Sequence, residues 1–279
     1  MTLPDDAHVG QVSLTVRDLD RSVLFYRDVL GLTETGSPRD GAASTAVALG
    51  APGGRGLIEL HENTNAIPKP RRSTGLYHFA ILVPSRPALG RSLRRLSEKR
   101  YPLTGASDHL VSEALYLDDP DGLGIEIYRD RPRGEWPARN GQLVMATDPL
   151  DLQGVFDEPG AETPWTGLEA GTVIGHVHLH VAHLDAAEQF YCGRIGFEPT
   201  VRGYPGALFV AAGGYHHHLG LNTWTGIGAP PPPENAVGLR AFTIASSQLT
   251  PSELIDDDTR VRVLLSRTST TEDAENTET

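Results

Sequence analysis

The sequence predicts an α+β fold made of tandem βαβββ modules, three complete and a fourth degenerate, arranged as two half-barrel-like domains. Segment 8–32 recurs at 173–197, at a shift of 165 residues, and a related segment starts at Leu76, at a shift of 67 residues from the first. Segments 8–32 and 173–197 share Gly10/Gly175, Val12/Val177, Leu14/Leu179, Val16/Val181, Leu19/Leu184, Asp20/Asp185, Phe25/Phe190, Tyr26/Tyr191 and Gly31/Gly196. Internal repetition of one supersecondary unit is the mark of a duplicated architecture.

The first module is predicted over residues 8–61. Its opening strand alternates polar and apolar side chains from Gln11 to Val16, as a half-buried strand does. An amphipathic helix follows, and Gly31 ends it. Short apolar segments at 46–49 and 57–60 predict the last strands, which gives the order β-α-β-β-β.

The second module is predicted over residues 74–128 in the same order. Its helix is expected at 88–99, and the Asp-Asp-Pro-Asp-Gly segment at 118–122 predicts a turn before the last strand. We expect the modules 8–61 and 74–128 to form the first domain, residues 8–128.

The second domain is predicted over residues 172–265, with a complete module at 172–224 and a degenerate one at 238–265. The degenerate module retains a first and a last strand but almost nothing between them. Residues 129–171, rich in Pro, Gly and Trp, are interpreted as an ordered connector between the halves. The polar, acidic residues 266–279 predict a disordered tail.

The bulk composition favours a soluble globular protein of the cytoplasm. The net charge of −12 over 279 residues disfavours nucleic acid and anionic membranes as partners. Cys192 is the only cysteine, so no intrachain disulfide forms. No apolar run approaches the roughly 18 residues of a membrane span, and the N-terminus lacks a signal region. The composition is compatible with a homo-oligomer.

Three histidines of the third module point to one face of its first strand. Because Val177 and Leu179 are apolar, alternation places His176, His178 and His180 together on the opposite face. A histidine-rich strand face inside a repeated scaffold predicts a functional site, although hydrogen-bonded polar residues on an exposed sheet face would give the same pattern.

Candidate metal ligands occupy equivalent positions in the repeat. Gln11, His78 and His176 align in the first strands, and Glu59 and Glu126 align in the last strands, again 67 residues apart. Two histidines and one carboxylate form the facial triad that leaves open positions on Fe(II). Because Gln is a poor Fe(II) ligand, the first module is interpreted as structural.

These residues stand in motifs of a known family. The motifs are LYHFAIL with His78, IGHVHLHV with His176, YLDDPDGLGIEIY with Tyr116 and Glu126, and HHHLGLN with His217. Together they resemble the vicinal oxygen chelate (VOC) superfamily, and in particular type I extradiol ring-cleaving dioxygenases of the catechol 2,3-dioxygenase kind. The resemblance covers nearly all of residues 8–265.

The resemblance implies an oxidoreductase that adds both atoms of O2 to catechol or another small aromatic diol. It implies an Fe(II) cofactor with the ligands His78, His176 and Glu126. His217 would be the catalytic acid and base, and Tyr116 would hydrogen-bond the bound diol. His109, seven residues before Tyr116, would contact the substrate if a loop difference brings it to the family's position slightly further upstream; an ordinary loop histidine is the alternative.

Two departures bear on this assignment. Strict strand alternation groups His217 with Leu219 on the apolar face, so that His216 or His218 would face the cavity instead. The family normally places its site in the last two modules, whereas here the fourth module has Ala241 at the histidine position. We therefore expect the second and third modules to supply the ligands.

Two other functions fit the same scaffold. A glyoxalase-like lyase or isomerase would use Ni(II) or Zn(II) and usually needs a second carboxylate, which only Glu59 would add in the first module. A binding protein of the bleomycin-resistance type would use the fold without metal or catalysis.

Overall fold

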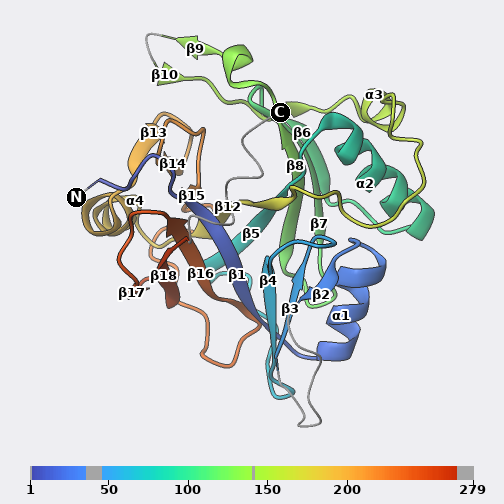
Figure 1. The fold of residues 1–279 in the computed structure, drawn as a ribbon. Helices are drawn as coiled ribbons and strands as arrows, with labels where there is room; N and C mark the ends of the chain where they lie inside the picture. Colours follow the sequence, from blue (N-terminus) through green and yellow to red (C-terminus); the bar gives the residue numbers. More distant parts are fainter. Residues whose placement is uncertain (1, 36–45, 140–141, 269–279) are drawn as a thin grey trace.

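The computed structural model describes residues 2–35, 46–139 and 142–268 (Figure 1). The first module contains β1 His8–Val16, α1 Leu19–Asp28, β2 Thr33–Thr35, β3 Ala46–Gly50 and β4 Ile58–Glu62. The second contains β5 Gly75–Leu82, α2 Arg86–Lys99, β6 Gly105–Asp108, β7 Ser112–Asp118 and β8 Gly124–Asp130. Both follow the predicted β-α-β-β-β order, which confirms the modular α+β fold.

The later elements continue this pattern. The connector carries η1 Arg133–Glu135, β9 Ala138–Arg139, β10 Gln142–Leu143, β11 Asp148–Pro149 and α3 Leu152–Phe156. The third module contains β12 Val173–His180, α4 Leu184–Glu188, the π-helical η2 Gln189–Ile195, β13 Glu198–Val201, β14 Ala207–Ala211 and β15 Leu219–Asn222. The fourth retains β16 Gly238–Ser246, β17 Ser252–Asp256 and β18 Val261–Arg267. Since β18 reaches Arg267, strand structure enters the predicted tail, of which residues 269–279 lie outside the described residues.

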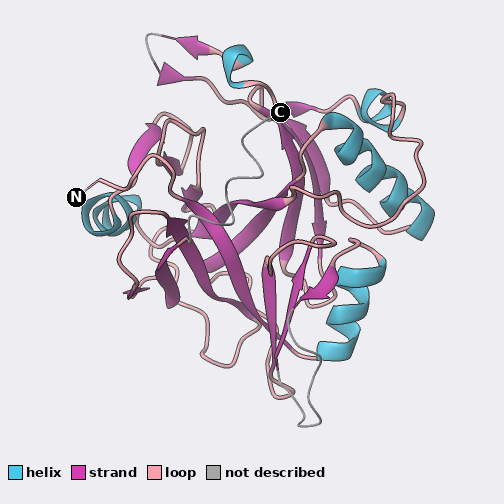
Figure 2. Ribbon diagram, viewed as in Figure 1, coloured by secondary structure: helices cyan, strands magenta, loops and turns pink. Residues whose placement is uncertain are grey.

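The strands form two large sheets at the centre of the molecule, with the longer helices at the periphery (Figure 2). The seven-stranded sheet has the order β17-β18-β16-β1-β4-β3-β2, so it joins the first and fourth modules. The nine-stranded sheet has the order β11-β6-β7-β8-β5-β12-β15-β14-β13, so it joins the second and third. The sheets therefore combine modules across the two predicted domains, 8–128 and 172–265.

The unpaired first strand of each module explains why each sheet combines modules from both predicted domains. Within the strands of each module the first strand is the outermost, so its backbone groups need a partner from another module. β1 pairs antiparallel with β16, and β5 pairs antiparallel with β12. The repeat makes all first strands alike, so repetition alone does not specify which two of them pair.

Modules that are consecutive in the chain meet through a repeated tyrosine. The hydroxyl of Tyr26 donates a hydrogen bond to Oδ2 of Asp119 at 3.1 Å, and the hydroxyl of Tyr191 donates to Oδ2 of Asp256 at 2.8 Å. Both tyrosines are fully buried. The same helix residue thus anchors the first module to the second and the third to the fourth, which gives the repeated Phe-Tyr pair a structural reason.

The repeated glycine at the end of the helical segments also has a backbone reason. Gly31 has φ 82° and Gly196 has φ 106°, in the left-handed region that disfavours residues with a Cβ. In addition, a Cβ at Gly31 would lie 2.4 Å from the Trp165 ring of the connector. Glycine therefore lets the chain turn into the next strand in both copies.

Among the described residues, no helix is long and apolar enough to cross a membrane.

Candidate functional site

Three adjacent strands of the nine-stranded sheet bring the predicted ligands to one face. Glu126 on β8 pairs with Ala80 on β5, and Ala80 in turn pairs with His176 on β12. His78 lies two residues before Ala80, on the same face of β5. The small Ala80 between the larger side chains lets them converge above it.

The three side chains form a compact buried cluster. Nε2 of His78 and Nε2 of His176 each lie 3.0 Å from Oε2 of Glu126, and one ligand atom from each residue falls within 4.8 Å of the others. The exposed fractions are 6% for His78 and 2% for the other two. Among the described residues, no other such group of three or more potential ligands occurs.

The electrostatics of this cluster favour a metal ion. Burial raises the pKa of Glu126, but the two histidines outweigh burial and hold this pKa well below its usual value. Burial lowers the pKa of His176, which favours the neutral imidazole that metals require. Nε2 of His78 is buried and lacks a well-directed hydrogen bond despite its short distance to the carboxylate. These converging nitrogen and oxygen atoms fit a divalent cation.

Tyr116 and His109 form a hydrogen-bonded pair beside the cluster. Tyr116 on β7 pairs with Glu126 across the sheet, and its hydroxyl lies 2.6 Å from Nε2 of His109. Nδ1 of His109 donates to the backbone oxygen of Ala146 at 2.6 Å, so Nε2 accepts from Tyr116. Burial and the Glu126 charge raise the pKa of Tyr116 well above its usual value, which keeps its hydroxyl protonated.

The three consecutive histidines have three different environments. Among the described residues, only His217 of the three lines the cavity, and its ring centroid lies 4.2 Å from that of His176. His216 is fully buried and bonds to Asp130. Nδ1 of His218 accepts a hydrogen bond from the backbone of Ala212.

Strand alternation does not apply to His216 and His218, because the strand does not extend that far. β15 begins at Leu219, and residues 216–218 precede it in irregular backbone. The side-chain directions there do not follow a period of two.

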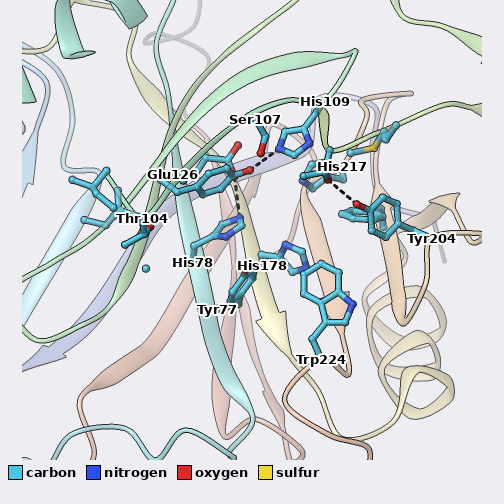
Figure 3. Close-up of a pocket in the computed structure, with 18 of the residues that line it drawn as sticks. Tyr77, His78, Thr104, Ser107, His109, Glu126, His178, Tyr204, His217 and Trp224 are labelled. Atoms are coloured by element: carbon cyan, nitrogen blue, oxygen red, sulfur yellow. Dashed lines mark hydrogen bonds and ion pairs between the residues drawn. The ribbon is translucent and has the colours of Figure 1, made fainter. Parts of the chain in front are cut away.

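A cavity of about 540 Å³ opens in front of the cluster. Figure 3 shows His78, Glu126, His109, His178 and His217 around it. Other lining residues are the aromatic side chains Tyr77, Tyr204, Phe209 and Trp224. The described residues that line the cavity include two carboxylates, Glu126 and Asp118, but no Lys or Arg. This cavity suits a small, flat, apolar ligand with polar groups directed at the cluster.

His178 is a cavity residue that was not among the predicted site residues. It pairs with His78 across β5 and β12, and its ring lies between Tyr77 and Trp224 at centroid distances of 5.2 and 5.4 Å. A Cβ at Gly220 would lie 2.7 Å from the His178 ring, so glycine makes room for it. Its buried Nε2 has no hydrogen-bond partner within the part of the chain that the structure describes. The histidine-rich face of the third module was its only signal in the sequence.

The equivalent positions in the seven-stranded sheet hold no such cluster within the described residues. Glu59 bonds to His61 at 2.8 Å, and Gln11 donates to the backbone of Gly56 at 3.5 Å. Ala241 replaces the histidine in the fourth module. The structure therefore brings His78, Glu126 and His176 together. Gln11 and Glu59 of the first module have no corresponding histidine, because the fourth module has Ala241 at that position.

Paired βαβββ modules around a buried His–Glu–His cluster define a class of proteins whose scaffold suits a metal-dependent site. The family model of the Glyoxalase/Bleomycin resistance protein/Dioxygenase superfamily matches residues 8–127 and 173–271. The chain therefore belongs to this superfamily.

Known proteins extend this likeness. The catechol-2,3-dioxygenase of Bacillus subtilis (strain 168) is 49% identical over 247 residues, which cover 87% of this chain and 84% of that protein. A solved structure described as a dioxygenase, from the same organism, covers 95% of this chain and 87% of its own, with 13% identity and a TM-score of 0.61. Glyoxalase I from Zea mays covers 93% and 92%, with 15% identity and a TM-score of 0.53. At such low identity the two structures support the fold alone.

Proposed function

We propose that the chain is an Fe(II)-dependent extradiol dioxygenase that opens the ring of catechol or a substituted catechol with O2. The observation that carries the proposal is the buried cluster of His78, Glu126 and His176 at the end of an aromatic cavity. Two histidines and one carboxylate are the ligand set of oxygen-activating Fe(II) sites. The catechol-2,3-dioxygenase of Bacillus subtilis, at 49% identity, supports the same reaction class.

The residues present fit such a metal and can be given roles. Fe(II) held by the cluster would acidify the diol and bring it together with O2. Tyr116, kept neutral and with its proton donated to His109, lines the cavity beside Glu126, where its oxygen can accept a hydrogen bond from a diol hydroxyl. His217 on the other side is placed to take a proton from a diol hydroxyl and return it to the product. Both oxygen atoms enter the product, so no external reductant is needed.

The competing functions fit this site less well. A glyoxalase-like site usually uses two carboxylates, and among the described residues the cluster offers only that of Glu126. A binding protein without metal gives no reason for burying Glu126 between two histidines, because an ionised carboxylate costs free energy when it leaves water.

Protein prepared without oxygen and loaded with Fe(II) is expected to consume O2 and convert catechol to a yellow ring-opened semialdehyde. Chelation should remove this activity, and Fe(II) with a reductant should restore it. Absorbance and an oxygen electrode measure the two quantities together. Restoration by Zn(II) alone, or a colourless product cut between the two hydroxyls, would contradict the proposal.

The charge of the cavity predicts which diols enter. With Asp118 and Glu126 in the lining and no described Lys or Arg, a carboxylate on the substrate ring has no cationic partner. We expect kcat/KM for 3,4-dihydroxybenzoate to be at least about tenfold below that for catechol, or ~1.4 kcal/mol. Asp118→Asn should reduce the difference in kcat/KM between the two diols. Equal kcat/KM values for the two diols would refute this selectivity while leaving the ring-cleavage reaction standing.

A further inference from the structure

A buried chain of hydrogen bonds leads from the cavity to a carboxylate outside its lining. Nδ1 of His217 lies 2.8 Å from Nδ1 of His216, and Nε2 of His216 lies 2.8 Å from Oδ1 of Asp130. His216 is fully buried and His217 is 5% exposed, whereas the side chain of Asp130 is 23% exposed. Only His217 of these three residues lines the cavity.

A second branch ends on the same carboxylate. The hydroxyl of Tyr215 donates to Oδ2 of Asp130 at 2.8 Å, so the hydroxyl of Tyr128 donates to Tyr215, also at 2.8 Å. The ring of Tyr128 packs against His176 at a centroid distance of 4.8 Å. Asp130 ends β8, the strand that carries Glu126. One carboxylate thus organises the side chains behind both His176 and His217.

The order of donors and acceptors along this chain fixes a tautomer. An ionised carboxylate only accepts, so Nε2 of His216 carries a proton and donates it to Asp130. If His216 carries only this proton, its Nδ1 is an acceptor, and Nδ1 of His217 is then the donor of the bond between the two rings. The lone pair of His217 is left on Nε2, which has no partner among the described residues and belongs to a ring that lines the cavity.

The surroundings hold His216 in place. The hydroxyl of Thr200 donates to its backbone oxygen at 2.7 Å. Trp136 of the connector and Tyr215 cover its ring at centroid distances of 5.2 and 4.0 Å. A ring packed against two aromatic side chains and hydrogen-bonded at both nitrogens has little conformational freedom, which suits a group that orients a catalytic base.

We propose that Asp130 and His216 are positioning residues that set the orientation and tautomer of His217, so that its free Nε2 faces the diol. Neither residue touches the substrate, and both act through His217. The catalytic consequence rests on the proposed dioxygenase function, whereas the tautomer itself does not. The arrangement follows the general rule that a base is oriented by a third group behind it.

The tautomer is read directly by long-range ¹H–¹⁵N correlation spectra of Zn(II)-loaded protein labelled with ¹⁵N-histidine. We expect the His217 signal, identified by its loss in His217→Phe, to show a proton on Nδ1. His216→Phe removes the acceptor and should give a mixture of tautomers. His216→Gln restores an amide oxygen as acceptor and should return the signal towards the wild-type pattern.

Kinetics with Fe(II)-loaded protein and catechol test the catalytic consequence. Asp130→Asn and His216→Phe should each lower kcat by about 10- to 100-fold, as loss of the orienting partner does for a general base, with KM and iron content nearly unchanged. The double variant Asp130→Asn/His217→Phe should have a kcat less than about twofold below that of His217→Phe alone. The reason is that Asp130 acts through His217, which the second substitution has removed.

Asp256→Asn is the matched control, because it also removes a carboxylate that accepts from a tyrosine hydroxyl, but in the seven-stranded sheet. It should lower stability and leave kcat unchanged. A wild-type His217 protonated at Nε2 would overturn the positioning role, and so would Asp130→Asn and His217→Phe effects that multiply. The expected tautomer in protein that cleaves no catechol would contradict the proposed function and support the positioning of His217.

Discussion

His78→Ala, His176→Ala and Glu126→Ala are each expected to abolish tight metal binding and with it all ring cleavage. The three ligand atoms lie within 4.8 Å of one another, and removing one leaves only two protein ligands for the ion. Binding energy at such a site depends on the full ligand set. Iron content after anaerobic loading and desalting measures the effect directly, and we expect less than about a tenth of the wild-type content.

The duplicated fold supplies the control for these variants. Gln11 and Glu59 occupy the equivalent strand positions in the first module, so Gln11→Ala and Glu59→Gln test the same backbone environment without touching the cluster. Both should leave iron content near normal. If His176→Ala keeps its iron while Glu59→Gln loses it, the site lies in the seven-stranded sheet and the reaction class is wrong.

The effect of removing Glu126 on the fold can also be measured without metal. Its carboxylate accepts from His176 in a fully buried setting, so Glu126→Ala leaves both histidines without an anionic partner. Burial favours the neutral form of His176, and the fold is retained because strand pairing at this position uses backbone atoms. Circular dichroism on each variant separates lost metal from lost structure.

Repetition is why the sequence could predict that His78, Glu126 and His176 lie together. Because side chains alternate along a strand, the same offset between His78 and Glu126 and between Gln11 and Glu59 placed each pair on one face of a module. The partner histidine, His176, followed from the same alignment. These inferences needed only local backbone geometry, which every copy of the module repeats.

The pairing of modules was beyond such reasoning. Pairing of β1 with β16 and of β5 with β12 depends on contacts between distant segments, whereas the repeat makes all first strands equivalent. The result determines which sheet brings two histidines and a glutamate together. Pairing the second module with the third joins His78 and Glu126 to His176, and the remaining pair joins Gln11 and Glu59 to Ala241.

Asp130 and His216 escaped prediction for a different reason. Asp130 is the last residue of β8, and His216 is one of three adjacent histidines in the sequence. Their role follows from one bond between segments 86 positions apart in the chain. A single sequence carries no signal for such a contact, whereas the alternating face of β12 did carry one for His178.

His217→Phe is expected to keep its iron and to lower kcat by about 10²–10⁴-fold, the usual contribution of a general acid and base. Phenylalanine preserves the aromatic packing against His176, whose ring centroid lies 4.2 Å away, but removes both nitrogens. Burial lowers the pKa of His217 well below its usual value, so the wild-type ring is neutral and able to accept a proton.

The neighbouring histidine makes this test decisive. His218 lies outside the described cavity lining and bonds to the backbone of Ala212, so His218→Phe should reduce stability while kcat stays within about threefold. Steady-state kinetics with catechol, with iron content measured on the same samples, compare the two. If His218→Phe loses turnover and His217→Phe does not, the acid–base group is His218, and the hydrogen-bonded chain from Asp130 through His216 ends on a residue without a catalytic role.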